Sequence, residues 1–163
     1  MKKYLHLIIL LFVSTMTSWS QKAFDEKLKS LYKNTVPLIK SSELKTKLEH
    51  VTILDTRAPE EYKVSHIPGS RMINYTEFAV ADVQDIPKDT EVIVYCSVGY
   101  RSERVGEKLR KAGYKDVKNL YGGIFDWKNN GFEVVDLNNQ PTDSVHTYNK
   151  SWGKWLYEGI KVN

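Results

Sequence analysis

The chain has 163 residues, of which 41% are hydrophobic and 27% charged, so it has the size and composition of a single soluble globular domain. This composition excludes disordered, collagen-like and multi-span membrane chains. The net charge of +4 is too small and too dispersed for a nucleic-acid-binding protein, which needs a basic stripe. The single cysteine, Cys96, excludes an internal disulfide and any mechanism that needs two thiols in one chain.

The first 20 residues have the layout of a secretory signal peptide. Lys2 and Lys3 precede a mostly apolar run over residues 4–13, and small polar residues follow up to Ser20. The apolar run is about half the roughly 20 residues that a membrane span requires. We expect residues 1–20 to be removed on export, most simply to a bacterial periplasm, which leaves no stable membrane anchor and a net charge of +2. The alternative is a buried N-terminal helix, although no capping residue precedes the run.

Beyond this segment, helical and strand patterns alternate. Apolar residues at helical spacing predict a helix within an N-terminal extension over residues 21–35. In the main domain, residues 36–136, extended or strand segments are expected at 36–39, 51–54, 71–74, 92–95, 117–120 and 132–135. Helices are expected at residues 41–49, 76–83, 102–112 and 124–130. Ser41 or Ser42 is the expected cap of the first of them. The alternation predicts an α/β fold, with a mainly parallel central sheet and helices on both faces.

The loop that begins at Cys96 carries the residues with the clearest chemistry. Ligands of open parallel α/β sheets bind beyond the carboxyl ends of the strands, and Cys96 directly follows the expected strand 92–95. Its sulfur would face the N-terminus of the next helix, with Arg101 five residues on, and both favour the thiolate over the thiol. Gly99 allows the chain to curl so that backbone amides point inward and form an anion nest. The loop therefore combines a nucleophile with an anion-binding cradle.

Four stretches of the sequence resemble the rhodanese-like sulfurtransferase family in their order and spacing. They are Leu54-Asp55-Thr56-Arg57 with Glu60-Glu61-Tyr62, His66-Ile67-Pro68-Gly69-Ser70, Cys96-Ser97-Val98-Gly99-Tyr100-Arg101-Ser102, and Leu120-Tyr121-Gly122-Gly123-Ile124 with Trp127 and Gly131. Ser70 is a mild departure, since the family motif has alanine there. The resemblance covers about residues 36–135. It implies a rhodanese-like domain in which Cys96 carries a persulfide during turnover, and no cofactor is required.

The expected site has Cys96 as its catalytic nucleophile. The expected substrate-binding residues are Ser97, Val98, Gly99, Tyr100, Arg101, Ser102 and Arg57. The planar guanidinium of Arg101 would suit the oxygens of thiosulfate, the alternative being an ordinary surface arginine. Asp55 is expected to support the site, and for both Asp55 and Arg57 structural support and substrate contact are equally open. His66 is expected to form structural hydrogen bonds in a turn rather than to act as a base. No metal site is expected, because the histidines lack metal-ligand spacing and cysteine ligands are missing.

These residues predict a sulfurtransferase that moves a sulfane sulfur from thiosulfate or a persulfide donor, through Cys96, to a thiophilic acceptor such as a thiol-bearing protein. A first alternative is a non-catalytic rhodanese-like module that binds a partner or senses an anion. A second is a cysteine-dependent phosphatase or arsenate reductase, which the spacing disfavours: Arg101 follows Cys96 at Cys-x4-Arg, whereas those enzymes use Cys-x5-Arg. A lone cysteine is more often a small buried hydrophobe, but the position of Cys96 between a strand and a helix favours catalysis.

Residues 137–163 lie beyond the resemblance and form an aromatic-rich tail. Tyr148, Trp152 and Trp155 are spaced i, i+4 and i+7, which predicts one face of a helix, although Gly153 weakens this prediction. We expect the helix to pack against the domain. The alternative is a partner or substrate-entry surface, because aromatic residues are enriched at interface hot spots.

Overall fold

The computed structural model describes residues 20–163, so the expected signal peptide lies, apart from Ser20, outside the described residues. The chain divides into two units after Leu31. In the first unit, residues 20–31 form a helix, which confirms the helix predicted from the apolar periodicity. None of the helices in the described part of the chain has the length and apolar character that a bilayer crossing requires.

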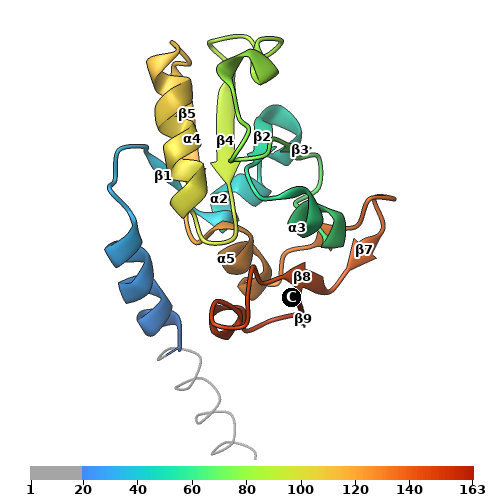
Figure 1. The fold of residues 1–163 in the computed structure, drawn as a ribbon. Coiled ribbons are helices and arrows are strands. Elements are labelled where there is room, and N and C mark those ends of the chain that lie inside the picture. The colour runs from blue at the N-terminus through green and yellow to red at the C-terminus, as the bar shows by residue number, and fades with distance from the viewer. Residues whose placement is uncertain (1–19) are drawn as a thin grey trace, which may run out of the picture. The chain divides into compact units, whose positions relative to one another are not determined.

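The second unit, Tyr32–Asn163, is built around a five-stranded parallel sheet (Figure 1). Its strands are β1 (Leu38–Ile39), β2 (Thr52–Asp55), β3 (Arg71–Met72), β4 (Glu91–Tyr95) and β5 (Asp116–Leu120). They lie in the order β1-β5-β4-β2-β3, which confirms the predicted parallel α/β sheet. Because β4 is central and β2 and β5 are its neighbours, the loops that leave the carboxyl ends of these three strands meet at one edge of the sheet.

Four α-helices and two short 3-10 helices surround this sheet. They are α2 (Ser41–Lys45), α3 (Pro59–Val64), α4 (Tyr100–Lys111) and α5 (Gly123–Asn129), with 3-10 turns at Leu48–His50 and Val80–Val83. On one face, Val105 and Leu109 of α4 share a buried core with Val92 and Val94 of β4. Gly106 lies on the side of α4 that faces the sheet. An added Cβ at this position would lie 3.4 Å from the Val94 side chain. This close packing fixes the start of α4 relative to the end of β4.

Two predicted helices need correction, and one observed helix had no prediction. No α-helix forms over 76–83, because the Asn74 side chain accepts bonds from the backbone and the hydroxyl of Thr76 and makes a turn, leaving only the 3-10 turn Val80–Val83. The expected helix 41–49 is split into α2 and the turn Leu48–His50, and its N-cap residue is Lys40. Ser41 instead donates its hydroxyl to Asp126 at 2.6 Å. Helix α3 was not predicted from the apolar pattern.

The strand expected at 132–135 does not join the central sheet. It is β6 (Val134–Val135), which pairs antiparallel with β7 (Pro141–Thr142). The helix expected around Tyr148, Trp152 and Trp155 is also absent. Instead, β8 (Ser144–His146) and β9 (Ile160–Val162) form a parallel pair, with a 3-10 turn at Gly153–Trp155 between them. A right-handed helix cannot pass through Tyr148, whose φ is 65°.

Candidate active site

Cys96 lies at the carboxyl end of β4 and at the start of the loop that leads into α4. Its residue surface is 1% exposed, and the backbone N–H of Gly99 donates to its Sγ at 3.1 Å. Gly99 is the N-cap of α4 with a φ of 95°, a left-handed conformation that glycine adopts readily. The sulfur therefore accepts a backbone N–H at the N-terminus of a 12-residue helix, where the helix dipole favours negative charge.

The N-terminus of α5 holds the other side of the same loop. The backbone N–H groups of Ile124 and Phe125 donate to the carbonyl oxygens of Cys96 and Ser97 at 2.9 and 3.2 Å. Gly123 makes this approach possible, because a Cβ at Gly123 would overlap the Cys96 carbonyl oxygen. The residue also has a φ of 57°. Gly122 and Gly123 thus allow the N-terminus of α5 to bind the backbone of the Cys96 loop, while the N-terminus of α4 faces the Cys96 sulfur.

Tyr32 supports the loop with its hydroxyl. It donates to the Val98 carbonyl at 2.7 Å and accepts the backbone N–H of Gly122 at 2.9 Å. Burial raises the pKa of Tyr32 well above its usual range, although the bond from Gly122 acts in the opposite direction. The hydroxyl therefore remains a donor throughout the neutral range, and it joins the Cys96 loop to the loop after β5. A Cβ at Gly99 would overlap the Tyr32 hydroxyl, so the contact also requires glycine at that position.

Asn119 of β5 fixes the end of the loop. Its Nδ2 donates to the Gly99 carbonyl at 2.9 Å, and its Oδ1 accepts the hydroxyl of Ser102 at 2.7 Å. Both Asn119 and Ser102 are fully buried. Ser102, which the sequence placed among the substrate-binding residues, is therefore found in the support of the loop.

Arg101 is held beside the loop by Glu61 of α3. Its Nη1 and Nη2 donate to Glu61 Oε2 and Oε1 at 2.7 and 2.8 Å, and Nη2 also donates to the Ser97 hydroxyl at 3.0 Å. Ser97 in turn donates to Glu61 Oε1 at 2.9 Å. These contacts use three of the five N–H groups of the guanidinium.

The charges in this cluster support one another. Burial alone would raise the pKa of Glu61, but the hydrogen bonds and charge of Arg101 hold it below its usual range. Burial lowers the pKa of Arg101, and the hydrogen bonds and charge of Glu61 oppose this effect, so that the pKa of Arg101 is raised. Glu61 thus stays ionised, and Arg101 stays cationic beside the Cys96 loop. Bidentate, charge-assisted hydrogen bonds of this kind fix both the position and the orientation of the guanidinium.

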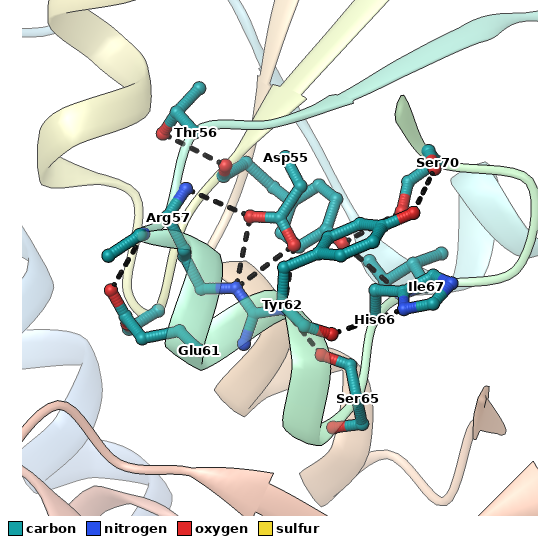
Figure 2. A network of polar contacts seen from close by, with 12 residues as sticks. Asp55, Thr56, Arg57, Glu61, Tyr62, Ser65, His66, Ile67 and Ser70 are labelled. Atoms are coloured by element: carbon teal, nitrogen blue, oxygen red, sulfur yellow. Dashed lines mark hydrogen bonds and ion pairs between the residues drawn. The ribbon is translucent and has the colours of Figure 1, made fainter. Parts of the chain in front are cut away.

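Asp55 and Arg57 form a buried ion pair at the end of β2 (Figure 2). Arg57 Nε lies 3.0 Å from both carboxylate oxygens of Asp55, and Nη2 lies 2.6 Å from Oδ2. The same Nη2 donates to the carbonyl of Ser65, just after α3, at 2.6 Å. Both side chains are fully buried. This arrangement joins β2 to the end of α3, the helix that carries Glu61.

His66 lies beside this pair, in the turn that follows α3 (Figure 2). Its ring stacks on Tyr62 with centroids 3.9 Å apart, and its Nδ1 lies 3.3 Å from the Tyr62 carbonyl. Its backbone pairs with Val135. Burial lowers the pKa of His66 below its usual value, which favours the neutral ring. These contacts hold the ring in the turn.

The structure thus brings Cys96, Ser97, Gly99 and Arg101 together, while Val98 is nearly buried and the Tyr100 ring is exposed. Sequence reasoning did not assign roles to Glu61, Tyr32 or Asn119. Glu61 had a local signal, because it occupies the third position of a helix that begins at a proline and accepts the Ala58 N–H. Tyr32 and Asn119 had none, because the residues they hold are distant in sequence.

Comparison with known families gives this geometry a context. The family described as "Rhodanese-like domain" matches residues 40–130. The chain belongs to the rhodanese-like domain family. A protein named "Sulfurtransferase" from Allochromatium vinosum is 34% identical over 87 residues, covering 53% of this chain and 80% of the relative. A tRNA uridine(34) hydroxylase from Bdellovibrio bacteriovorus is 34% identical over 117 residues, covering 61% of this chain but only 33% of that protein.

Solved structures show the same rhodanese-like fold. A rhodanese-related protein from Thermoplasma volcanium superposes with a TM-score of 0.56 at 28% identity, covering 61% of this chain and 97% of that one. A thiosulfate sulfurtransferase from Pseudomonas aeruginosa has a TM-score of 0.57 at 28% identity and covers 74% of this chain and 23% of that chain. The family match ends at residue 130, so β6, β7, β8 and β9 lie beyond the matched rhodanese-like domain.

Proposed function

We propose that this protein is a sulfurtransferase that carries a sulfane sulfur as a persulfide on Cys96. The donor is thiosulfate or a persulfide, and the acceptor is a thiophilic nucleophile such as cyanide or a thiol. The observation that carries the proposal is the placement of the Cys96 sulfur. It accepts a backbone N–H at a helix N-terminus, in a loop whose Ser97 hydroxyl binds Arg101, which Glu61 holds in place.

In the first half-reaction the Cys96 thiolate attacks the outer sulfur of thiosulfate. A bond forms between Sγ and this sulfur, the bond between the two sulfur atoms of thiosulfate breaks, and sulfite leaves with the electron pair. Arg101 is suited to stabilise the negative charge of thiosulfate and of the departing sulfite, because preorganised donors cost little reorganisation during reaction. Its two N–H groups that are not donated to Glu61 and Ser97 are the donors available for this role.

In the second half-reaction the acceptor attacks the outer sulfur of the Cys96 persulfide. The new bond forms between acceptor and outer sulfur, and the Cys96 thiolate leaves with the electron pair of the broken S–S bond. The Gly99 N–H, which lies 3.1 Å from Sγ, stabilises this thiolate as it is regenerated. One cysteine completes this cycle, consistent with the single thiol of the chain.

Intact-mass measurement tests the proposal directly. After incubation with thiosulfate, the protein should gain the mass of one sulfur atom and lose it when cyanide is added. Cys96→Ser should gain nothing and keep its fold, since the change is nearly isosteric and a serine hydroxyl is not ionised near neutral pH. A wild-type protein that gains no sulfur from thiosulfate or from glutathione persulfide would be a binding module rather than a sulfurtransferase.

We also propose that the protein is exported. The support is the signal-peptide layout of residues 1–20. Outside the cytoplasm a lone thiol is readily oxidised and has no second cysteine in the chain to resolve it. Protein from the exported fraction should therefore begin after Ser20 and carry Cys96 as a persulfide that cyanide removes. Recovery of the full chain, still starting at Met1, from the cytoplasmic fraction alone would contradict export.

A further inference from the structure

The tail beyond the rhodanese-like domain returns to the Cys96 loop. The ring of Tyr148 lies against the guanidinium of Arg101, with the Arg101 Cζ 5.3 Å from the ring centroid. This is within the about 6 Å at which a cation and an aromatic face attract each other. Glu61 binds the Nη1 and Nη2 donors of the same guanidinium. The Arg101 guanidinium is therefore contacted by Glu61 of α3 and by Tyr148 of the tail.

Hydrogen bonds on both sides of Tyr148 fix the turn in which it lies. Thr147 is fully buried, and its backbone N–H donates to the Val162 carbonyl of β9 at 2.8 Å. The Tyr148 N–H donates to His146 Nδ1 at 3.0 Å. After the turn, Asn149 Oδ1 accepts the backbone N–H groups of Ser151 and Trp152. The position of the Tyr148 backbone is thus fixed by its neighbours.

The tail is also fastened to the body of the domain. The side chain of Asn129, at the end of α5, donates to the Trp155 carbonyl at 2.9 Å and accepts the Tyr157 N–H at 2.6 Å. Lys128 and Asp143 form an ion pair at 2.7 Å. Val145 of β8 is completely buried, and β8 packs beside α3. The tail is therefore part of the fold around the Cys96 loop.

Tyr148 itself has an unusual conformation for its type. Its φ of 65° is uncommon for a bulky residue, and the residue is 56% exposed. Neither a gain in burial nor a backbone preference explains a tyrosine here, and asparagine or glycine would suit the backbone better. Conformational strain of this kind is retained where it serves a site. Its ring lies against the guanidinium of Arg101.

We propose that Tyr148 is a positioning residue for the sulfur-transfer site: its ring holds Arg101 beside Glu61 and toward Cys96, and so sets the preference of the site for small anionic donors such as thiosulfate. The inference rests on the proposed function for its biological meaning. Its physical content, the orientation of one cation toward one thiol, can be measured without sulfur transfer.

The first test uses alkylation of Cys96, the only thiol in the chain. Iodoacetate and iodoacetamide have the same reactive carbon but differ in charge, so the ratio of their rates reports how well Arg101 faces the sulfur. Tyr148→Asn keeps a residue suited to positive φ and removes the ring. It should lower the iodoacetate-to-iodoacetamide ratio by roughly threefold, the size expected for one exposed cation–π contact. Tyr148→Phe should retain the wild-type ratio.

The controls separate positioning from general stability. Tyr157→Phe changes another partly exposed tyrosine of the tail and should leave the ratio unchanged. In an Arg101→Ala background, Tyr148→Asn should have no further effect, because the residue acts through Arg101. An unchanged ratio in Tyr148→Asn, or an equal drop with and without Arg101, would overturn the proposal.

The second test is the rate of sulfur loading on Cys96 followed by intact mass. Tyr148→Asn should raise the KM for thiosulfate by about threefold, in line with the same contact, with little change in kcat and in the persulfide level at saturation. A fall in kcat at constant KM would contradict a positioning role. If the wild-type protein accepts no sulfur from any donor, the proposed function fails, whereas the alkylation ratio still decides whether Tyr148 orients Arg101.

Discussion

Glu61 and Arg101, which lie 40 residues apart in sequence, form a two-pronged ion pair with N···O distances of 2.7 and 2.8 Å. Glu61 is 2% exposed and Arg101 18%. The pair joins α3 to the first turn of α4 at the point where Cys96 enters the loop. Arg101, the cation bound to Ser97 of the Cys96 loop, is therefore oriented by a helix that does not belong to this loop.

Replacing Glu61 by Gln should weaken this orientation without removing the side chain. The amide can still accept the Ala58 N–H that Glu61 accepts at 3.0 Å, but it cannot bind Arg101 at both oxygens. We expect the free energy of unfolding to fall by about 2 kcal/mol, and kcat/KM for thiosulfate to fall roughly tenfold, or about 1.4 kcal/mol. Glu60→Gln, at the exposed neighbouring position, is the matched control. Equal losses in both variants would contradict the role of the pair.

The same pair predicts a specific dependence of stability on pH. Because Arg101 holds the pKa of Glu61 below its usual range despite burial, the ionised carboxylate stabilises the folded state. This contribution is complete above the ordinary glutamate pKa of about 4.3 and is lost as the pH falls through the lower pKa of the folded protein. The stability gap between wild type and Glu61→Gln should therefore shrink in acid, as measured by urea unfolding between about pH 7 and pH 3. A gap that stays constant over this range would count against the assignment.

The parallel sheet and the active loop could be predicted because their signals are local. The apolar run Val92–Tyr95 is buried on both faces as a central strand requires, and Gly99 adopts the positive φ that an anion nest needs. Cys96 follows this strand directly, so its place at the sheet edge follows from the topology rule alone. These features depend on residues within a few positions of one another.

The errors arise where long-range contacts override a local pattern. The spacing of Tyr148, Trp152 and Trp155 fits a helix, but pairing of β8 with β9 and the positive φ of Tyr148 impose a turn. Ser41 has the chemistry of a helix cap, yet its hydroxyl binds Asp126, which is 85 residues away. Partners at such distances leave no periodic signal in a single sequence. The roles of Tyr32 and Asn119 were hidden for the same reason.

Gly123→Ala should displace the Cys96 loop. The new methyl group would overlap the Cys96 carbonyl oxygen, and alanine would also be strained at a φ of 57°. Strain alone is worth roughly 1–2 kcal/mol, so a larger loss reports the overlap. Gly131→Ala separates the two effects, because Gly131 also has a positive φ but has nothing within 4 Å of an added Cβ. We expect Gly131→Ala to lose stability only by the strain and to retain sulfur loading, and Gly123→Ala to lose both. Similar losses of loading in the two variants would show that the carbonyl contact is unimportant.

Removal of the Tyr32 hydroxyl should make the Cys96 loop less firmly held. Tyr32→Phe deletes the bond to the Val98 carbonyl at 2.7 Å and leaves the Gly122 N–H without its acceptor. A buried group that loses its partner costs about 1–3 kcal/mol, and the cost here falls on the two loops that meet at Cys96. Tyr114→Phe is the matched control, because it deletes a buried hydroxyl that donates to the Val83 carbonyl. Tyr114 follows the C-terminal end of α4, whereas Cys96 precedes its N-terminal end.

Hydrogen exchange distinguishes the two variants. In Tyr32→Phe, peptides that contain Gly99 and Gly122 should exchange faster than in wild type. The reason is that local opening of the loop no longer has to break the hydrogen bonds of the Tyr32 hydroxyl, so it costs less free energy. Sulfur loading of Cys96 should slow along with this change, because the Gly99 N–H that faces Sγ is less well positioned. Tyr114→Phe should lower stability with no selective change in these peptides. If both variants affect exchange across the domain alike, Tyr32 contributes only to general stability and does not hold the loop.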